Sequence, residues 1–137
     1  MSSTECTTSN HKVVIITDDY DEEVKKHWDA DFFLFTDAQY ELLPSAIETM
    51  IEAFKNDYIG IVYSNGRSDH VIYSEPYNRI RLEQTNIIVG PVMISKDAMR
   101  IWNTYSPDMY LKMTTQYIAI HIPQILWQQN DKAYNNS

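Results

Sequence analysis

Three short, almost continuous apolar runs constrain the fold of this chain more than any other feature of its sequence. They read KVVIIT at 12–17, DFFLFT at 31–36 and YIGIVYS at 58–64. An apolar run without polar alternation is typical of a strand that is covered on both faces. We therefore expect these runs to lie in the interior of a sheet.

Helix-forming segments lie between the apolar runs. In DDYDEEVKKHW at 18–28, acids come early and lysines late, which favours a short helix because these charges complement its dipole. The clearest helix is predicted over 44–56, where Pro44 suits the first turn. Its apolar face is formed by Ile47, Met50, Ile51 and Phe54. A third helix is predicted over 96–105, with Ser95 as its cap.

Further strands complete an alternating pattern. Residues 86–95 and 116–127 read as strands, and Asn65-Gly66 indicates a hairpin that leads into 70–74. Because strands and helices alternate, the sequence predicts an α/β fold in which helices flank a mostly parallel sheet in three layers. Residues 12–127 are expected to form one domain between a loose polar segment at 1–11 and a loose tail at 128–137.

Composition limits the classes of partner. The chain has 137 residues and a net charge of −8, which argues against a broad contact with the phosphate backbone of nucleic acids. Cys6 is the single cysteine, so no internal disulfide can form. The N-terminus has no apolar signal region, and the apolar runs are too short for membrane insertion. We expect a cytoplasmic protein.

One long segment resembles a known family. FFLFTDAQYELLPSAIETMIEAFKNDYIGIVYSNGR, at 32–67, is similar to the middle of a family 2 glycosyltransferase with the GT-A fold. In that family a hydrophobic strand ends in Asp-Ala-Asp-Asp, a proline then opens a helix, and the next strand resembles 59–64. VVIITDDYDEE, NIIVGPVMISKDAMRIWNTYSPDM and HIPQILW resemble other segments of the family in the same order, so the resemblance touches most of residues 12–127.

The resemblance implies a nucleotide-sugar site beyond the carboxyl ends of the strands. Asp37 would contact the diphosphate or a divalent cation, Mn or Mg, which stabilises charge on the leaving group. Gln39 would be a neutral neighbour of that cation, and Asp18 and Asp19 would contact the nucleotide. The resemblance also implies that the strands at 12–17, 31–36 and 58–64 are parallel neighbours and that these aspartates converge on one pocket.

Two departures from the family pattern bear on transfer chemistry. Gln39 stands where the family has a second acid, and a glutamine oxygen brings no charge to a cation. The segment YLKMTTQYIAI at 110–120, which matches the position of the family's acidic pair, contains neither Asp nor Glu. Asp108 is the nearest acid and is therefore our one candidate for the base that deprotonates the acceptor.

Three interpretations of the chain stay open. It transfers a sugar from a nucleotide-sugar donor, or it is a catalytically inactive relative without a cofactor that serves as a structural or protein-binding module. In the second case, surface aromatic residues would mark the face for a protein partner. The third interpretation is an unrelated small α/β domain. Structural roles also fit the candidate residues, since Asp37 suits a turn before Pro44 and Asp18 and Asp19 suit the cap of a helix.

Overall fold

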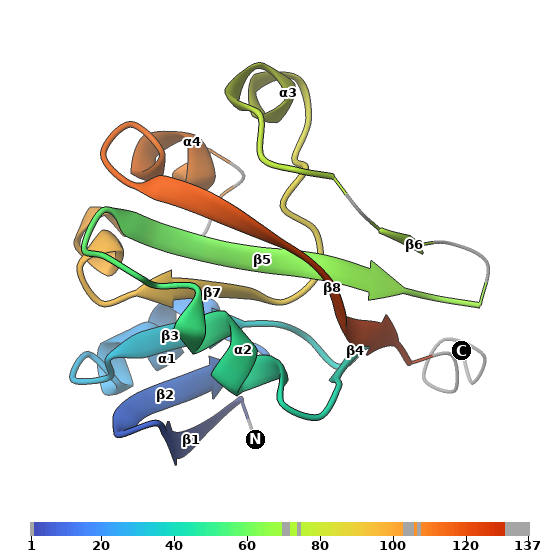
Figure 1. The fold of residues 1–137 in the computed structure, drawn as a ribbon. Coiled ribbons are helices and arrows are strands. Elements are labelled where there is room, and N and C mark those ends of the chain that lie inside the picture. Colours follow the sequence, from blue (N-terminus) through green and yellow to red (C-terminus); the bar gives the residue numbers. More distant parts are fainter. Residues whose placement is uncertain (1, 70–71, 74, 103–105, 107, 131–137) are drawn as a thin grey trace.

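The described residues form a single mixed sheet with short helices around it. The computed structural model describes residues 2–69, 72–73, 75–102, 106 and 108–130. The strands are β1 Ser3–Thr8, β2 His11–Ile16, β3 Phe32–Phe35, β4 Tyr40–Leu42, β5 Ile59–Arg67, β6 Ile72–Tyr73, β7 Val92–Ser95 and β8 Ile118–Gln129. The helices are α1 Tyr20–Lys26, α2 Ala46–Glu52, α3 Arg79–Gln84, the 3-10 helix η1 Ala98–Ile101 and α4 Met109–Met113. Figure 1 shows their arrangement.

The sheet contradicts the predicted fold class. Its order is β1-β2-β3-β7-β5-β8-β4, with β6 paired to β5. The pairs β2–β3 and β5–β8 are parallel, whereas the other five pairs are antiparallel. The result is a strongly curled, mixed half-barrel with few helices rather than a mostly parallel sheet in three layers. Alternation of strand and helix along the chain did not predict strand direction, because antiparallel neighbours need no helical crossover.

Strand β7 accounts for much of this difference. It lies between β3 and β5 and is antiparallel to both. Two of the three apolar runs, β2 and β3, are parallel neighbours as the resemblance implied, but β5 is separated from them by one strand. The three apolar runs therefore do not form three adjacent parallel strands.

Most elements nevertheless lie where the sequence predicted them. The three apolar runs are β2, β3 and β5, and α1 carries its acids in the first turn and its lysines in the last. Ser95 accepts a hydrogen bond from the Ala98 N–H, although the helix it caps is the short 3-10 helix η1. The helix predicted over 44–56 is confirmed over 46–52, and part of the segment 96–105 lies outside the described residues.

Three predictions of local structure differ from the structure. Asn65-Gly66 does not form a turn, because β5 continues to Arg67 and pairs with both β6 and β8. The segment 1–11 contains β1, joined to β2 by a tight turn in which Ser9 and Asn10 both have positive φ, as a type I′ turn requires. Strand β8 extends two residues past 127 to Gln129.

The sheet buries a separate hydrophobic cluster on each face. On one face, strand residues pack with α1, α3, η1 and α4. On the other, they pack with Ala46, Met50 and Ile51 of α2. Side chains alternate between the faces along each strand: Val14 and Ile16 of β2 belong to the first cluster and Val13 to the second.

Trp127 joins the ends of several elements. This residue of β8 is fully buried. Its ring contacts that of Tyr40 in β4 edge-on and stacks on that of Tyr73 in β6. Two glycines leave room for the indole, because a Cβ on Gly66 would lie 1.9 Å from the indole Cε2 and a Cβ on Gly90 would lie 2.5 Å from the same atom. Gly90 also has a φ of +79°, a conformation that other residues rarely adopt.

We predict that Gly66→Ala lowers the free energy of unfolding by about 2 kcal/mol or more, since overpacking a core commonly costs about 1–3 kcal/mol. Chemical denaturation followed by circular dichroism measures this. Gln124→Ala, an exposed position in β8, is the control and should change stability by less than about 0.5 kcal/mol. Equal stabilities for Gly66→Ala and the parent would contradict the packing of Trp127 described above.

Candidate functional site

A small pocket lies at the carboxyl end of β3. It has a volume of about 220 Å³ and is formed by the end of β3, the segment that follows it, the start of α1, residues 86–92 and α4. Its polar lining side chains are Tyr20, Thr36, Asp37, Tyr40, Asn86 and Tyr110. The pocket therefore combines aromatic walls with several hydrogen-bonding groups, which is the usual composition of a small-molecule site.

Thr36 is the most informative residue of this pocket. Its exposed fraction is 7%, and among the described residues its Oγ1 has no hydrogen-bond partner. The backbone at this position is held firmly, because the Tyr20 hydroxyl donates to the Thr36 carbonyl oxygen over 2.7 Å. Buried hydroxyl groups are nearly always hydrogen-bonded, so a hydroxyl without a protein partner in a pocket wall points to a ligand or solvent partner.

The pocket also lies beside a second unpartnered polar atom. Among the described residues the buried indole Nε1 of Trp127 has no hydrogen-bond partner. It lies directly behind Gly90, where a Cβ would be 2.9 Å from it, and Gly90 lines the pocket. Two buried donors that lack acceptors among the described residues thus belong to this wall or lie beside it.

Asp37 closes a turn and also lines the pocket. Its Oδ1 accepts a hydrogen bond from the Gln39 N–H over 2.7 Å, so the carboxylate closes a turn. The same side chain lines the pocket and is half-buried. One carboxylate oxygen is therefore engaged by the turn, and the residue still contributes to the pocket wall.

The other predicted site residues do not line this pocket. Asp18 and Asp19 lie between β2 and α1, where Asp18 Oδ1 accepts from the Asp19 N–H. Asp19 holds the N-cap position of α1 with a φ of 49°, but its side chain makes no capping bond. Gln39 is exposed, and Asp108 is exposed at the start of α4. The structure thus brings only Asp37 of the five candidates into the pocket wall.

The donor set does not form a cage for a divalent cation. Magnesium and manganese prefer six oxygen ligands, and protein sites usually supply several carboxylates. Within the described part of the chain, no group of three or more His, Cys, Asp and Glu side chains is placed to hold a metal ion. Asp37 alone supplies too few ligands to hold a divalent cation. A cation at this position would therefore have to arrive bound to a phosphate group of the ligand.

Several pocket residues were not identified from sequence. Thr36 directly precedes Asp37 and was interpreted only as part of a strand, and Tyr20 belonged to a segment interpreted as a helix. The sequence feature that could have identified Thr36 as a pocket residue is its hydroxyl side chain directly after a buried strand. Asn86 and Tyr110 reach the pocket only through the fold, because they are distant from Asp37 in the chain.

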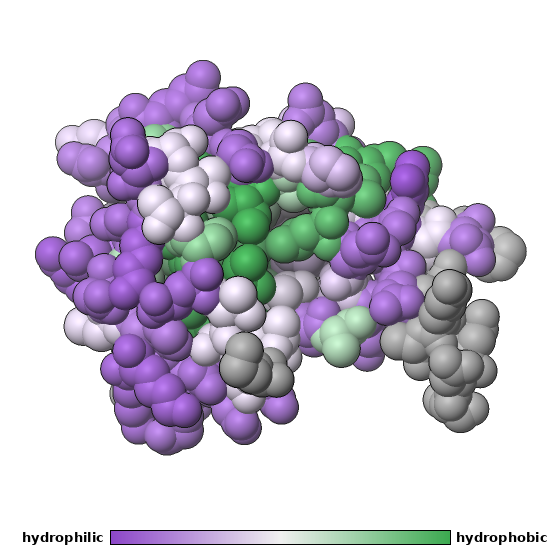
Figure 2. All heavy atoms as spheres, turned by 90° about the horizontal axis from the view of Figure 1, so that it is seen from below, coloured by the Kyte–Doolittle hydropathy of each residue, from purple (hydrophilic) through white to green (hydrophobic). Residues whose placement is uncertain are grey.

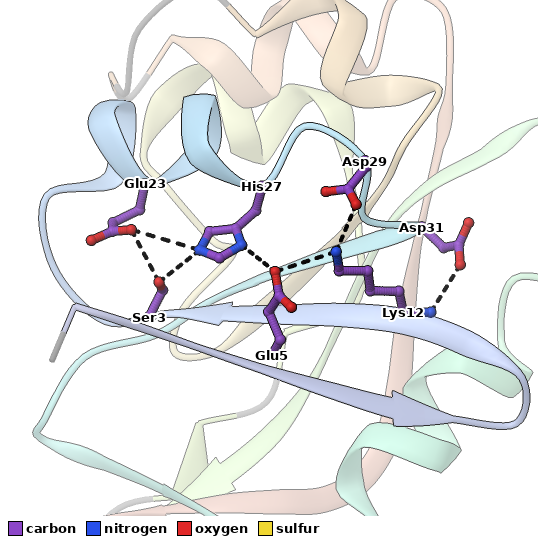
Figure 3. Close-up of polar contacts among 7 residues, drawn as sticks. All are labelled: Ser3, Glu5, Lys12, Glu23, His27, Asp29 and Asp31. Atoms are coloured by element: carbon purple, nitrogen blue, oxygen red, sulfur yellow. Dashed lines mark hydrogen bonds and ion pairs between the residues drawn. The ribbon is translucent and has the colours of Figure 1, made fainter.

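A second polar cluster fastens β1 to α1, on the far side of the sheet from α2 (Figure 3). His27 donates from Nδ1 to Glu5 Oε1, and its Nε2 lies 3.0 Å from Ser3 Oγ. Lys12 Nζ lies 3.3 Å from Glu5 Oε1 and 2.6 Å from Asp29 Oδ2. The hydrogen bond from His27, assisted by Lys12, holds the pKa of Glu5 below its usual value against the opposing effect of desolvation.

A serine, a histidine and an acid contact one another in this cluster, as they do in a catalytic triad: Ser3, His27 and Glu5. Their other contacts nevertheless favour a structural role. Ser3 Oγ donates to Glu23 Oε2 over 3.0 Å, so its hydrogen is drawn to a carboxylate rather than to His27. Glu23 also lies 3.8 Å from His27 Nε2, which places the imidazole between two acids. These contacts join the imidazole, at the end of α1, to Glu5 of β1, so His27 links this strand to the helix.

Comparisons with known proteins assign no family. No family model matches the chain, and no curated protein matches it. A search of the described helices found none with both the length and the apolar character needed to cross a membrane.

We predict that Glu5→Gln destabilises the protein at neutral pH and that the difference becomes smaller as the pH falls below about 4.5. Because the folded-state pKa of Glu5 is depressed, its contribution is present above the unfolded value of about 4.5 and is lost as the pH falls through the lower folded value. Denaturation midpoints at pH 7 and pH 3 measure this. Glu48→Gln, an exposed carboxylate on α2, is the control. A deficit of Glu5→Gln that persists unchanged at pH 3 would argue against the ion pair.

Proposed function

We propose that the protein binds a small polyhydroxylated ring, such as the sugar of a nucleotide-sugar, in the pocket beside Asp37. The observation that carries this proposal is that Thr36, whose buried Oγ1 has no partner among the described residues, is one of the residues that line the pocket. A ligand hydroxyl would satisfy it as donor or acceptor. The segment around Asp37 is also the part of the sequence that resembles nucleotide-sugar enzymes.

The size of the pocket favours a single ring. Sites for drug-sized ligands commonly measure about 300–1,000 Å³, whereas this pocket measures about 220 Å³. A complete nucleotide-sugar would exceed it, so the nucleotide would extend out of the pocket into solvent.

The lining chemistry matches sugar hydroxyl groups. Asp37 accepts hydrogen bonds, while Thr36 and the Asn86 amide can both donate and accept. The tyrosine rings supply apolar faces against which the C–H groups of a sugar can pack. Asp37 would repel a bare phosphate, so we expect a diphosphate to require a divalent cation that arrives with it.

Binding without transfer is the function that these residues support best. Asp37 is the one carboxylate in the pocket lining, and its Oδ1 is engaged in a turn. Asp108, proposed as the base from sequence, is exposed and does not line the pocket. We place this binding function in the cytoplasm, as expected from the sequence.

We predict opposite effects of Thr36→Val on stability and on binding. Valine has nearly the same shape and removes a buried hydroxyl that has no partner in the described part of the chain. The free protein should therefore be as stable as the parent or more stable by about 1 kcal/mol. The affinity for UDP-glucose should fall by roughly tenfold or more, because its partner hydroxyl is then unpaired.

Calorimetric titration with UDP-glucose, glucose and UDP, each with and without Mn²⁺, measures the binding. Asp37→Ala should also abolish it, whereas Gln39→Ala, which removes an exposed side chain of the same turn, should leave it unchanged. Binding that survives both Thr36→Val and Asp37→Ala, or no binding by the parent protein, would overturn the proposed function.

A further inference from the structure

The face of the sheet that carries α2 has one short helix packed on it among the described helices. Helix α2 has 7 residues and is therefore about 10 Å long. The neighbouring β8 has 12 residues and extends about 40 Å, and seven strands follow one another across the sheet. Among the described helices, α2 supplies the buried helical residues of this cluster. The central strand residues of this cluster, such as Val13, Leu34 and Val62, are nevertheless fully buried, so apolar exposure is limited to the partly buried residues around them.

Apolar side chains remain partly exposed on this face. Cys6 of β1, Ile15 of β2 and Ile47 of α2 pack against the buried cluster on the α2 side but are not themselves buried. Figure 2 shows hydrophobic side chains in a hollow in the middle of the molecular surface, surrounded by hydrophilic ones. An apolar hollow with a polar rim is typical of an interaction site.

A groove extends this surface past the end of α2. It has a volume of about 360 Å³, and its apolar walls include Phe32, Ile51 and Phe54. The ring of Phe54 packs on that of Phe32 with 4.8 Å between their centroids, so the groove is a formed feature of the packing. Its apolar walls belong to the same cluster as Ile15 and Ile47.

The charges beside this surface indicate the sign of the partner. Helix α2 carries Glu48 and Glu52, has no basic residue in its last turn, and both glutamates are exposed. Within the described part of the chain, neither glutamate side chain makes a hydrogen bond or an ion pair. Lys55 follows the helix, and the groove is lined by Lys96 together with three acids, Asp31, Asp57 and Asp97. The chain as a whole carries a net charge of −8.

We propose that this face docks a basic amphipathic helix of a partner protein. Its apolar side would lie against Ile15, Ile47 and the groove beside Phe54, next to α2, and its lysines or arginines would pair with Glu48 and Glu52. One helix, α2, already packs on this face. Helix-in-groove binding uses an apolar stripe of this kind. A second copy is a poorer occupant, because two faces with the same acidic rim repel each other.

A pair of synthetic peptides tests this proposal. One is an amphipathic helix with leucines on one side and lysines on the other, and the second has glutamate in place of each lysine. Fluorescence anisotropy should show saturable binding of the lysine peptide and at least ~10-fold weaker binding of the glutamate peptide. Alkylation of Cys6, the single thiol, should become slower when the lysine peptide is bound.

Charge reversal gives the decisive comparison. The double variant Glu48→Lys, Glu52→Lys should lose the lysine peptide and gain the glutamate peptide, while Glu22→Lys on α1, across the sheet, should behave as the parent. Ile47→Lys should weaken both peptides, and its far-ultraviolet spectrum shows whether it folds. Absent binding, equal binding of the two peptides, or no reversal in the double variant would overturn the proposal. Concentration-dependent dimers that Ile47→Lys abolishes would identify a second copy as the occupant instead.

Discussion

The burial of Trp127 between two glycines is the contact on which the rest of the fold depends. The indole touches the positions of Gly66 in β5 and Gly90 before β7, and it packs against Tyr40 and Tyr73 from β4 and β6. These elements are distant in sequence. In the sheet, however, β5 lies directly between β7 and β8. Trp127 therefore packs the ends of these elements together beside Gly90, which lines the candidate pocket.

The same contact gives the pocket its position. Gly90 and Tyr40 both line the pocket, and both also lie against the indole of Trp127. A ligand in the pocket thus sits against a wall whose far side is a rigid aromatic group. Pre-positioned walls reduce the ordering cost of binding, which suits a site with few polar groups. The polar network of His27 lies apart from it, between β1 and α1, and stabilises the edge of the sheet.

Sequence patterns identified local structure better than topology. The apolar runs of β2, β3 and β5 were recognised because burial on both faces removes polar alternation. The direction of β7 could not be inferred, since GPVMIS is equally compatible with parallel and antiparallel pairing. The positions of β4 and α4 were missed, as strands and helices of three to five residues leave little periodic signal.

The candidate site was predictable in part. Asp37 was singled out because an acid follows a buried strand, and the structure places it in the pocket wall. Asp18 and Asp19 were expected at the same site, because the carboxyl ends of neighbouring parallel strands β2 and β3 lie at one edge. Their separation from the pocket arises from the early start of α1, whose Tyr20 occupies the intervening space and donates to Thr36. No single-sequence pattern reports that contact.

The most direct test of the account is the indole N–H spectrum of the protein during a titration with UDP-glucose. The chain has three tryptophans, of which Trp127 lies behind the pocket and half-exposed Trp28 lies beside Phe33. The account predicts a saturable shift of the Trp127 signal, with the Trp28 signal unchanged. A stationary Trp127 signal, or a shift confined to Trp28, would contradict a ligand site built against this side chain.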